Sequence, residues 1–379
     1  MPDRRVPLSN LVIGEEELAA ITEVYRSGWL TMGPRTAELE RQFADYVGTR
    51  HAVAVSSGTA ALHLICLGAG LGPGDEVVVP SLTFVATANA IKYTGATPVF
   101  ADVRDLERPW LSADAVEAAI GERTKAIMAM SYGGHPGEIE ALASLARSHD
   151  LVLLEDAAHG LGARVGGRRL GTFGLAGAFS FFSNKNLPVG EGGMIVTDDD
   201  EVAEQARLLR SHGMTKGTWE RFKGETMSYD VVGLGFNYRI DEPRAALASA
   251  RLPWLDDANR RRGEHVAEYR RLLGDHNELL IPMPGADSVE SAHHLFTVVL
   301  DEGIDRDAVR QGMADAGIET SIHYPPVHGF SLYRDPAVEL PQTEGYTRRT
   351  ITLPLFPELT EEQQGEVAEA LRAAMSKAS

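Results

Sequence analysis

The chain has 379 residues, and its 54 acidic and 36 basic residues give a formal charge of −18 at pH 7. Its 44% hydrophobic and 24% charged residues are typical of a globular protein and exclude a disordered or low-complexity chain. Nucleic acids and anionic membranes bind basic protein surfaces. Because this chain is acidic overall, we expect neither as a partner. The one cysteine, Cys66, excludes an intrachain disulfide, and no apolar run suits a signal peptide or a membrane span, so we expect a cytoplasmic location.

The first half of the chain alternates helices and short apolar strands. Two amphipathic helices are expected around residues 18–25 and 39–47. The expected strands are then 51–55, 76–79, 98–101, 126–130 and 151–154, and the expected helices between them are 59–67, 84–93, one opened by Ser112, and 138–149. Because these strands are apolar throughout, both of their faces should be covered. Repeated βα units of this kind predict an α/β fold with a mostly parallel sheet.

The second half departs from this pattern. Strands are expected at 179–182 and 194–196, a helix at 201–210 and a long loop over 211–238. Asp241 should open a long helix to about Leu273, kinked at Pro253. The remainder has an expected strand at 296–300, a helix at 306–316, an extended segment at 318–323 and a last helix with a capping box at 360–363. We therefore expect a large domain over 1–250, whose N-terminal helices could pack on the other domain, and a smaller α+β domain over 251–379 that includes the connecting helix.

Ser57, Gly58 and Thr59 stand where a strand ends and a helix begins. Free N–H groups at a helix N-terminus bind anions, and glycine allows a ligand to approach the backbone closely. An ordinary serine N-cap explains the same residues equally well.

Two further signals follow along the chain. Asp156 ends an apolar strand, where α/β sheets place ligands, with His159 just beyond it; a capping aspartate and a packed histidine are the alternative. Lys185 lies 29 residues after Asp156 (185 − 156), before a Gly-rich turn, and by itself could be a solvated loop lysine. Together, an anion cradle, a strand-end carboxylate and a lysine meet the needs of the phosphate, pyridine nitrogen and aldehyde of pyridoxal phosphate (PLP).

The chain also resembles a known family over nearly its whole length. The segments that carry the likeness are 57–62, 72–76, 80–87, 95–98, 155–160, 180–185, 190–193, 210–213 and 235–239. They are similar, in the same order, to the motifs of the DegT/StrS-type PLP-dependent nucleotide-sugar aminotransferases. The resemblance implies the fold-type-I PLP-transferase fold, with helices on both sides of the large mixed sheet.

The resemblance also implies roles for individual residues. Lys185 would be the Schiff-base lysine and proton shuttle, and Asp156 would pair with the pyridinium nitrogen. The other cofactor-binding residues would be Gly58, Thr59 and Ser180 at the phosphate, Phe84 against the ring, His159 near the ring and Asp156, and Asn237 reaching the phosphate of a partner subunit. The last role implies a homodimer with shared active sites.

Other candidate sites are weaker. The glycines of 160–166 resemble a dinucleotide fingerprint, but neither a helix nor a suitably placed acidic residue follows them. His323 and His328 are spaced across two prolines without a Cys or acidic partner nearby, so we expect no metal; the resemblance places this segment near the substrate. Residues 260–262, three arginines, should lie on the solvated face of the long helix. No arginine clearly serves the carboxylates of an amino donor, although Arg239 is a possibility.

The resemblance implies amino transfer from L-glutamate to a nucleotide-linked keto-sugar by a ping-pong mechanism. Residues 155–159, 210–213, 219–221, 229 and 235–239 look most like the 4-aminotransferases, which favours C4 of a 4-keto-6-deoxyhexose. A cyclitol (keto-inositol) aminotransferase and a sugar 3-aminotransferase are the alternatives. A PLP-binding regulator would show cofactor binding without amino transfer.

Overall fold

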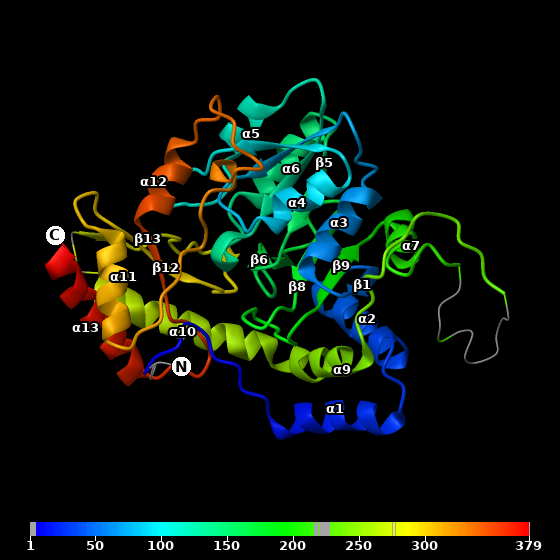
Figure 1. Ribbon diagram of the computed structural model, residues 1–379, viewed down its shortest axis with the longest axis horizontal. Coiled ribbons are helices and arrows are strands. Elements are labelled where there is room, and N and C mark those ends of the chain that lie inside the picture. The colour runs from blue at the N-terminus through cyan, green and yellow to red at the C-terminus, as the bar shows by residue number, and fades with distance from the viewer. Residues whose placement is uncertain (1–4, 216–218, 220–227, 275, 277, 379) are drawn as a thin grey trace.

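The computed structural model describes residues 5–215, 219, 228–274, 276 and 278–378 (Figure 1). Its largest sheet has seven strands in the order β1-β9-β8-β5-β4-β2-β3. Their bounds are β1 (His51–Val55), β2 (Glu76–Pro80), β3 (Thr97–Ala101), β4 (Thr124–Met130), β5 (Val152–Asp156), β8 (Ala176–Ser180) and β9 (Gly193–Thr197). Only β9 among them runs against its neighbours, so the predicted mostly parallel α/β sheet is confirmed.

Helices cover both faces of this sheet. On one face, alternate strand residues such as Val53 and Val77 pack with α3 (Gly58–Gly68), α4 (Ala86–Tyr93) and α7 (Asp200–Leu209). The opposite face is covered by α2 (Pro34–Val47), α5 (Ala113–Ala119), α6 (Ile139–Ser148) and α9 (Glu242–Arg251). Because successive side chains point to opposite faces, burial on both sides requires the uninterrupted apolar strands seen in the sequence.

A second apolar core forms around a smaller antiparallel sheet of β10 (Leu279–Leu280), β12 (Phe296–Leu300) and β13 (Thr350–Leu353). The helices α10 (Leu255–Leu273), α11 (Arg306–Asp315) and α13 (Glu361–Ala378) pack on it. Figure 1 shows α10 running from beneath the large sheet to this smaller one. Two more α-helices are α1 (Glu15–Ser27), which packs on α9, and α12 (Pro341–Arg349).

Several predicted helix ends are confirmed at atomic detail. Asp241 caps α9 by accepting from the amide of Arg244 at 3.1 Å. The long helix breaks at a short 3₁₀ turn, Leu252–Trp254, which contains the predicted kink residue Pro253. Before α13, Thr360 and Gln363 each accept from the other's amide at 3.1 Å, which is the predicted capping box.

Other boundaries were predicted wrongly. The strand expected at 179–182 is β8, which begins at Ala176 and ends at Ser180, because a sequence of small residues carries little strand signal. Three two-residue strands, β6 (Arg164–Val165), β7 (Arg168–Arg169) and β11 (Val289–Glu290), form an unpredicted third sheet. The extended segment expected at 318–323 agrees with the structure, in which Ile318 and Ser321 form isolated bridges outside the named strands. Among the described helices, none has the length and apolar character of a membrane span.

Candidate functional site

The site lies at the carboxyl edge of the seven-stranded sheet. Strands β1, β5 and β8 point the same way. Asp156 and Ser180 are the last residues of β5 and β8, and Gly58, which opens α3, follows the end of β1. A cavity of about 360 Å³ lies here. Seven of the eight predicted site residues line it: Gly58, Thr59, Phe84, Asp156, His159, Ser180 and Lys185. Asn237 does not line it and is exposed on the surface.

The N-terminus of α3 forms the anion-binding end of the cavity. Ser57 caps the helix by accepting from the amide of Ala60 at 3.1 Å, so the predicted N-cap is present as well. The first-turn amides of a helix have no carbonyl partner within it and are available to an anion. A Cβ on Gly58 would lie 2.8 Å from the Cβ of Ser180, so only glycine lets the helix approach the end of β8 this closely.

Asp156 is a buried carboxylate held in a fixed orientation. Its side chain is 4% exposed, and it accepts from the hydroxyl of Thr87 at 2.7 Å and from the amide of Ala158 at 3.1 Å. Burial raises its pKa, although these two hydrogen bonds and the nearby Lys185 oppose the change. Within the described chain Asp156 makes no ion pair, so its negative charge suits a cationic ring nitrogen.

Lys185 combines a defined backbone position with an activated amine. Its amide donates to the carbonyl of Phe182 at 2.8 Å in the turn after β8. Burial lowers the pKa of Lys185 to about 8, while the carboxylate of Asp156 acts in the opposite direction. Near neutral pH a larger fraction of this amine is therefore uncharged and nucleophilic than of an ordinary exposed lysine.

The residue after the lysine anchors this turn to the long helix. Asn186 donates to the side chain of Asn259 on α10 and to the carbonyl of Ala292, each at 2.7 Å. Its oxygen lies 2.9 Å from Nδ1 of His294. All three polar side chains are buried, so this network fixes the chain next to Lys185 from two other segments.

Sequence reasoning gave no individual role to several residues of the cavity, although the resemblance placed the segment 323–328 near the substrate. Met130, Phe182, Asn184, Glu191, His323 and Tyr324 also line it. The hydroxyl of Tyr324 lies 2.9 Å from Nε2 of His159, and the Tyr324 ring lies 5.7 Å from that of Phe84. Tyr324 gives no local signal, because its segment reaches the site only through the tertiary fold. Thr87 could have been found, since it ends the motif 80–87.

The histidines considered for a metal have separate partners. Nδ1 of His323 lies 2.9 Å from the hydroxyl of Thr352, and Nδ1 of His328 lies 2.7 Å from that of Ser81. No cluster of three potential metal ligands occurs in the part of the chain that the structure describes.

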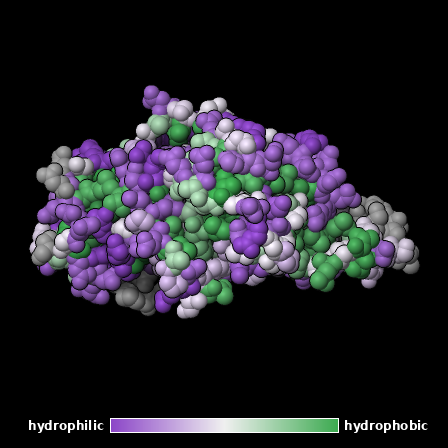
Figure 2. Space-filling model, turned by 90° about the horizontal axis from the view of Figure 1, so that it is seen from above, coloured by the Kyte–Doolittle hydropathy of each residue, from purple (hydrophilic) through white to green (hydrophobic). Residues whose placement is uncertain are grey.

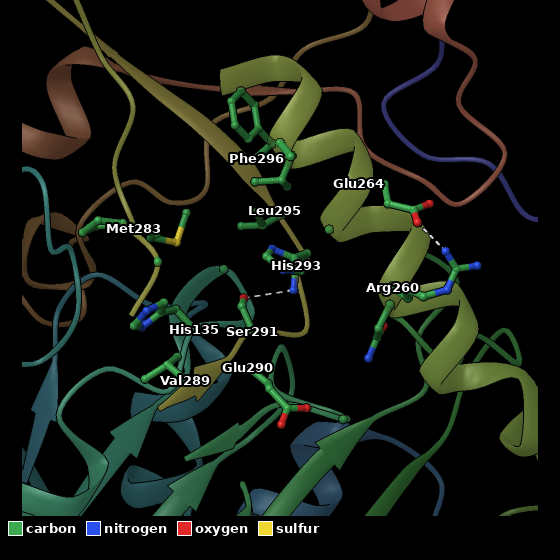
Figure 3. Close-up of a pocket in the computed structure, with 18 of the residues that line it drawn as sticks. His135, Arg260, Glu264, Met283, Val289, Glu290, Ser291, His293, Leu295 and Phe296 are labelled. Carbon is green, nitrogen blue, oxygen red and sulfur yellow. Dashed lines mark hydrogen bonds and ion pairs between the residues drawn. The ribbon is translucent and has the colours of Figure 1, made fainter. Parts of the chain in front are cut away.

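A larger cavity of about 760 Å³ lies beside α10, with 282–291 on its other side (Figure 3). None of the eight predicted residues lines it. Figure 3 shows Arg260 paired with Glu264 along the helix, and the amide of His293 bound to Ser291. The volume of a cavity alone therefore does not identify the catalytic site.

The three arginines of α10 do not share one environment. Arg260 and Arg261 are exposed and paired with Asp257, as expected for a solvated face. Arg262 is only 6% exposed, so the prediction was wrong for this residue: it points from the helix into the protein. Arg239 lines a separate cavity with Glu40 and Trp219, away from Lys185.

A half-buried lysine and a buried aspartate at the carboxyl edge of a mostly parallel sheet, beside a helix N-terminus, are the groups that an enzyme of the aminotransferase class requires. The chain belongs to the DegT/DnrJ/EryC1/StrS aminotransferase family, whose model matches residues 12–372. It is therefore an aminotransferase, as the sequence resemblance predicted.

Individual relatives agree with this assignment. The chain is 39% identical to the spore coat polysaccharide biosynthesis protein SpsC of Bacillus subtilis, covering 97% of this chain and 96% of that one. It is 39% identical to DesV of S. venezuelae, solved in complex with a ketimine intermediate, with a TM-score of 0.89 and 98% of each chain covered.

Two further solved structures were determined in a PLP-form or in the presence of a sugar product. The PLP-form of the putative sugar aminotransferase Spr1654 of Streptococcus pneumoniae is 28% identical, with a TM-score of 0.91 over 99% of each chain. DesI, solved in the presence of its TDP-sugar product, is 32% identical, with a TM-score of 0.88 over 99% of this chain and 93% of that one.

Proposed function

We propose that this enzyme uses PLP to transfer the amino group of L-glutamate to C4 of a 4-keto-6-deoxyhexose carried on a nucleoside diphosphate. The observation that carries the PLP chemistry is that Lys185, Asp156 and the N-terminus of α3 line one cavity. The PLP-form of Spr1654 and the TDP-sugar product of DesI support the cofactor and the substrate class.

The polar groups of the cavity fit PLP. Asp156 is buried and forms no ion pair among the described residues, and Nδ1 of His159 and the side-chain oxygen of Asn184 are buried without a hydrogen-bond partner there. Buried polar atoms of this kind are usually satisfied by a ligand or water. The amides of α3, with Thr59 and Ser180, would hold the phosphate.

Each residue then has a defined task. When bound, PLP supplies an electron sink that stabilises negative charge on the reacting carbon. Asp156 would keep the ring nitrogen protonated, and Thr87 would orient that carboxylate. Lys185 would hold the cofactor aldehyde and, once displaced, would carry a proton between the substrate carbon that bears the nitrogen and C4′ of the cofactor. Burial keeps His159 neutral by lowering its pKa, so Nε2 can take part in a hydrogen bond with Tyr324 without adding a charge.

The aromatic walls of the cavity suit a planar cofactor and a sugar ring. Phe84, Phe182 and Tyr324 line it, and Phe84 is 54% exposed. An exposed aromatic ring at the mouth of a cavity can contact a bound ring and shield it from water. Phe84 would pack against one face of the cofactor, as the family resemblance implies.

The experiment that tests this function is an amino-transfer assay with L-glutamate and a panel of acceptors. The panel contains a 4-keto and a 3-keto nucleotide sugar and a free keto-inositol. We expect turnover of the 4-keto nucleotide sugar, product NMR with nitrogen at C4, and less than about 1% of the turnover in Lys185→Ala, since removing a covalent catalytic group typically costs several orders of magnitude. Amination only at C3, or only of the keto-inositol, would replace the proposed acceptor with one of the two alternatives. Normal turnover in Lys185→Ala would refute the role of the lysine.

A further inference from the structure

A second cavity shares a wall with the first. It has a volume of about 420 Å³ and is lined by Asn184 and Lys185 from the turn after β8, by α10 and by the N-terminal segment. Asn184 and Lys185 line both cavities, so the lysine stands between the proposed PLP site and this space. Its volume is within the range of small-molecule sites.

Arg262 of α10 lines this second cavity and is a buried cation that forms no ion pair with the described residues. Its side chain is 6% exposed, and its Nε and one terminal guanidinium nitrogen, Nη1, are buried without a hydrogen-bond partner in the described structure. Burial lowers the pKa of Arg262 to about 10, and the carboxylate of Glu358 opposes this change. A buried guanidinium is costly unless an anion neutralises it.

The other charged groups around this cavity are largely paired among themselves. Arg251 lies 3.2 Å from Glu17, and it donates to the carbonyl of Val12 at 3.1 Å. Arg261 lies 2.9 Å from Asp257. The remaining acidic residues in its lining are Glu15, Glu16 and Glu358. All three are exposed to solvent, and none forms an ion pair with Arg262 among the described residues.

Given the proposed function, we infer that Arg262 binds a carboxylate of the amino donor. A carboxylate is a strong acceptor for guanidinium N–H groups, so an acidic donor would accept from the buried nitrogens and neutralise their charge. The amino group of the donor must reach the group held by Lys185, and the shared wall of the two cavities allows this. Arg262 is thus a positioning residue that selects an anionic amino donor.

The test separates the two half-reactions of the purified PLP enzyme by rapid mixing. In Arg262→Gln, the L-glutamate concentration for half-maximal rate should rise about 10- to 100-fold, the loss expected for hydrogen bonds to a charged group. The reverse half-reaction, with the amino sugar that the wild type forms, should change less than about 2-fold. Arg262→Lys should recover part of the glutamate affinity. Arg271→Gln is the matched control and should behave as wild type, because Arg271 lies on the same helix but is exposed, pairs with Glu268 and lines neither cavity.

A second readout does not depend on turnover. Glutarate, a dicarboxylate without an amino group, should raise the Tm of wild-type apoprotein and of Arg271→Gln, but not that of Arg262→Gln. Arg262→Gln itself should melt no lower than wild type, because it removes an unpaired buried charge.

The outcomes distinguish this inference from the proposed function. Unchanged glutamate kinetics in Arg262→Gln, or a lower Tm with equal losses in both half-reactions, would overturn the role of Arg262. A wild type that reacts with glutamate but with no keto-sugar would overturn the proposed acceptor and leave the role of Arg262 standing.

Discussion

Glu155 and Asp156 are neighbours at the end of β5, yet their surroundings separate their roles. Glu155 accepts from the amides of Gly171, Phe173 and Gly174 at 2.6–2.9 Å, which ties the following loop to the strand. Asp156, on the opposite face, accepts one hydroxyl and one amide and lines the cavity. Because successive side chains of a strand point to opposite faces, Glu155 holds the loop in place while Asp156 faces the cavity.

Asp156→Asn should keep the fold and some PLP but lower kcat by roughly 100-fold, because the amide cannot stabilise a positive charge on the ring nitrogen. Steady-state kinetics and the visible spectrum of the bound cofactor measure the two effects. Wild-type kcat in this variant would reduce Asp156 to a structural cap.

The lowered pKa of Lys185 predicts a pH dependence. The amine is charged below a pH of about 8 and free above it, so covalent attachment of PLP to the apoenzyme should accelerate as pH rises through about 8. Stopped-flow absorbance of apoenzyme mixed with PLP gives this rate. An inflection near the ordinary lysine pKa of about 10.4 would show that burial does not activate Lys185.

At the scale of the element, the close contact between α3 and β8 gives a prediction for Gly58. Gly58→Ala would place a Cβ 2.8 Å from that of Ser180 and force the phosphate end of the cavity apart, so PLP retention should fall about 10-fold or more. Dialysis followed by absorbance measures retention.

Gly365 is the matched control. It lies within α13 with nothing within 4 Å of an added Cβ, so Gly365→Ala should leave PLP binding unchanged and raise the free energy of unfolding by up to about 1 kcal/mol. Equal PLP retention in Gly58→Ala and Gly365→Ala would contradict phosphate binding at the N-terminus of α3.

The sequence predicted the elements that follow local rules and missed those that depend on distant partners. The apolar strands, Asp241 and the capping box at Thr360 each have a signal in the residues themselves. The strand pairs β6–β7 and β6–β11 exist because separate segments meet, and two residues carry no periodicity. The same limit explains the site: Asp156 and Lys185 could be found from strand ends, whereas Tyr324 could not.

At the scale of the whole molecule, Asn237 and nearby exposed apolar residues indicate a surface that binds a second chain. Asn237 is exposed and its backbone bridges that of Ser211. Val232 is 58% exposed and Leu234 is 91% exposed. Figure 2 shows hydrophobic surface over the middle of the molecule and again at the end beside the grey atoms. Exposed apolar patches of this kind mark interaction sites, which supports the proposed homodimer.

The dimer prediction is tested by light scattering, which should give at least two 41.0 kDa chains, and by mixing variants. Asn237→Ala should weaken PLP retention without lowering the Tm. A hybrid of Lys185→Ala and Asn237→Ala chains should regain activity at low PLP, because one of its sites combines an intact lysine with the intact asparagine of the other chain. An active monomer, or an inactive hybrid, would contradict shared sites.

The anchoring of Asn186 has a consequence for the speed of each turnover. Its bonds to Asn259 and Ala292 hold the main chain beside Lys185, so the amine moves only through its own side-chain torsions. Because the main chain beside it is fixed, the Lys185 amine approaches the same carbons in every cycle and reacts as if it were present at very high local concentration. Effective molarities of well-oriented groups reach about 10⁵–10⁸ M. The buried side chain of Asn186, one residue from Lys185, thereby ties the main chain beside the amine to the helix α10. This keeps the amine close to the reacting carbon.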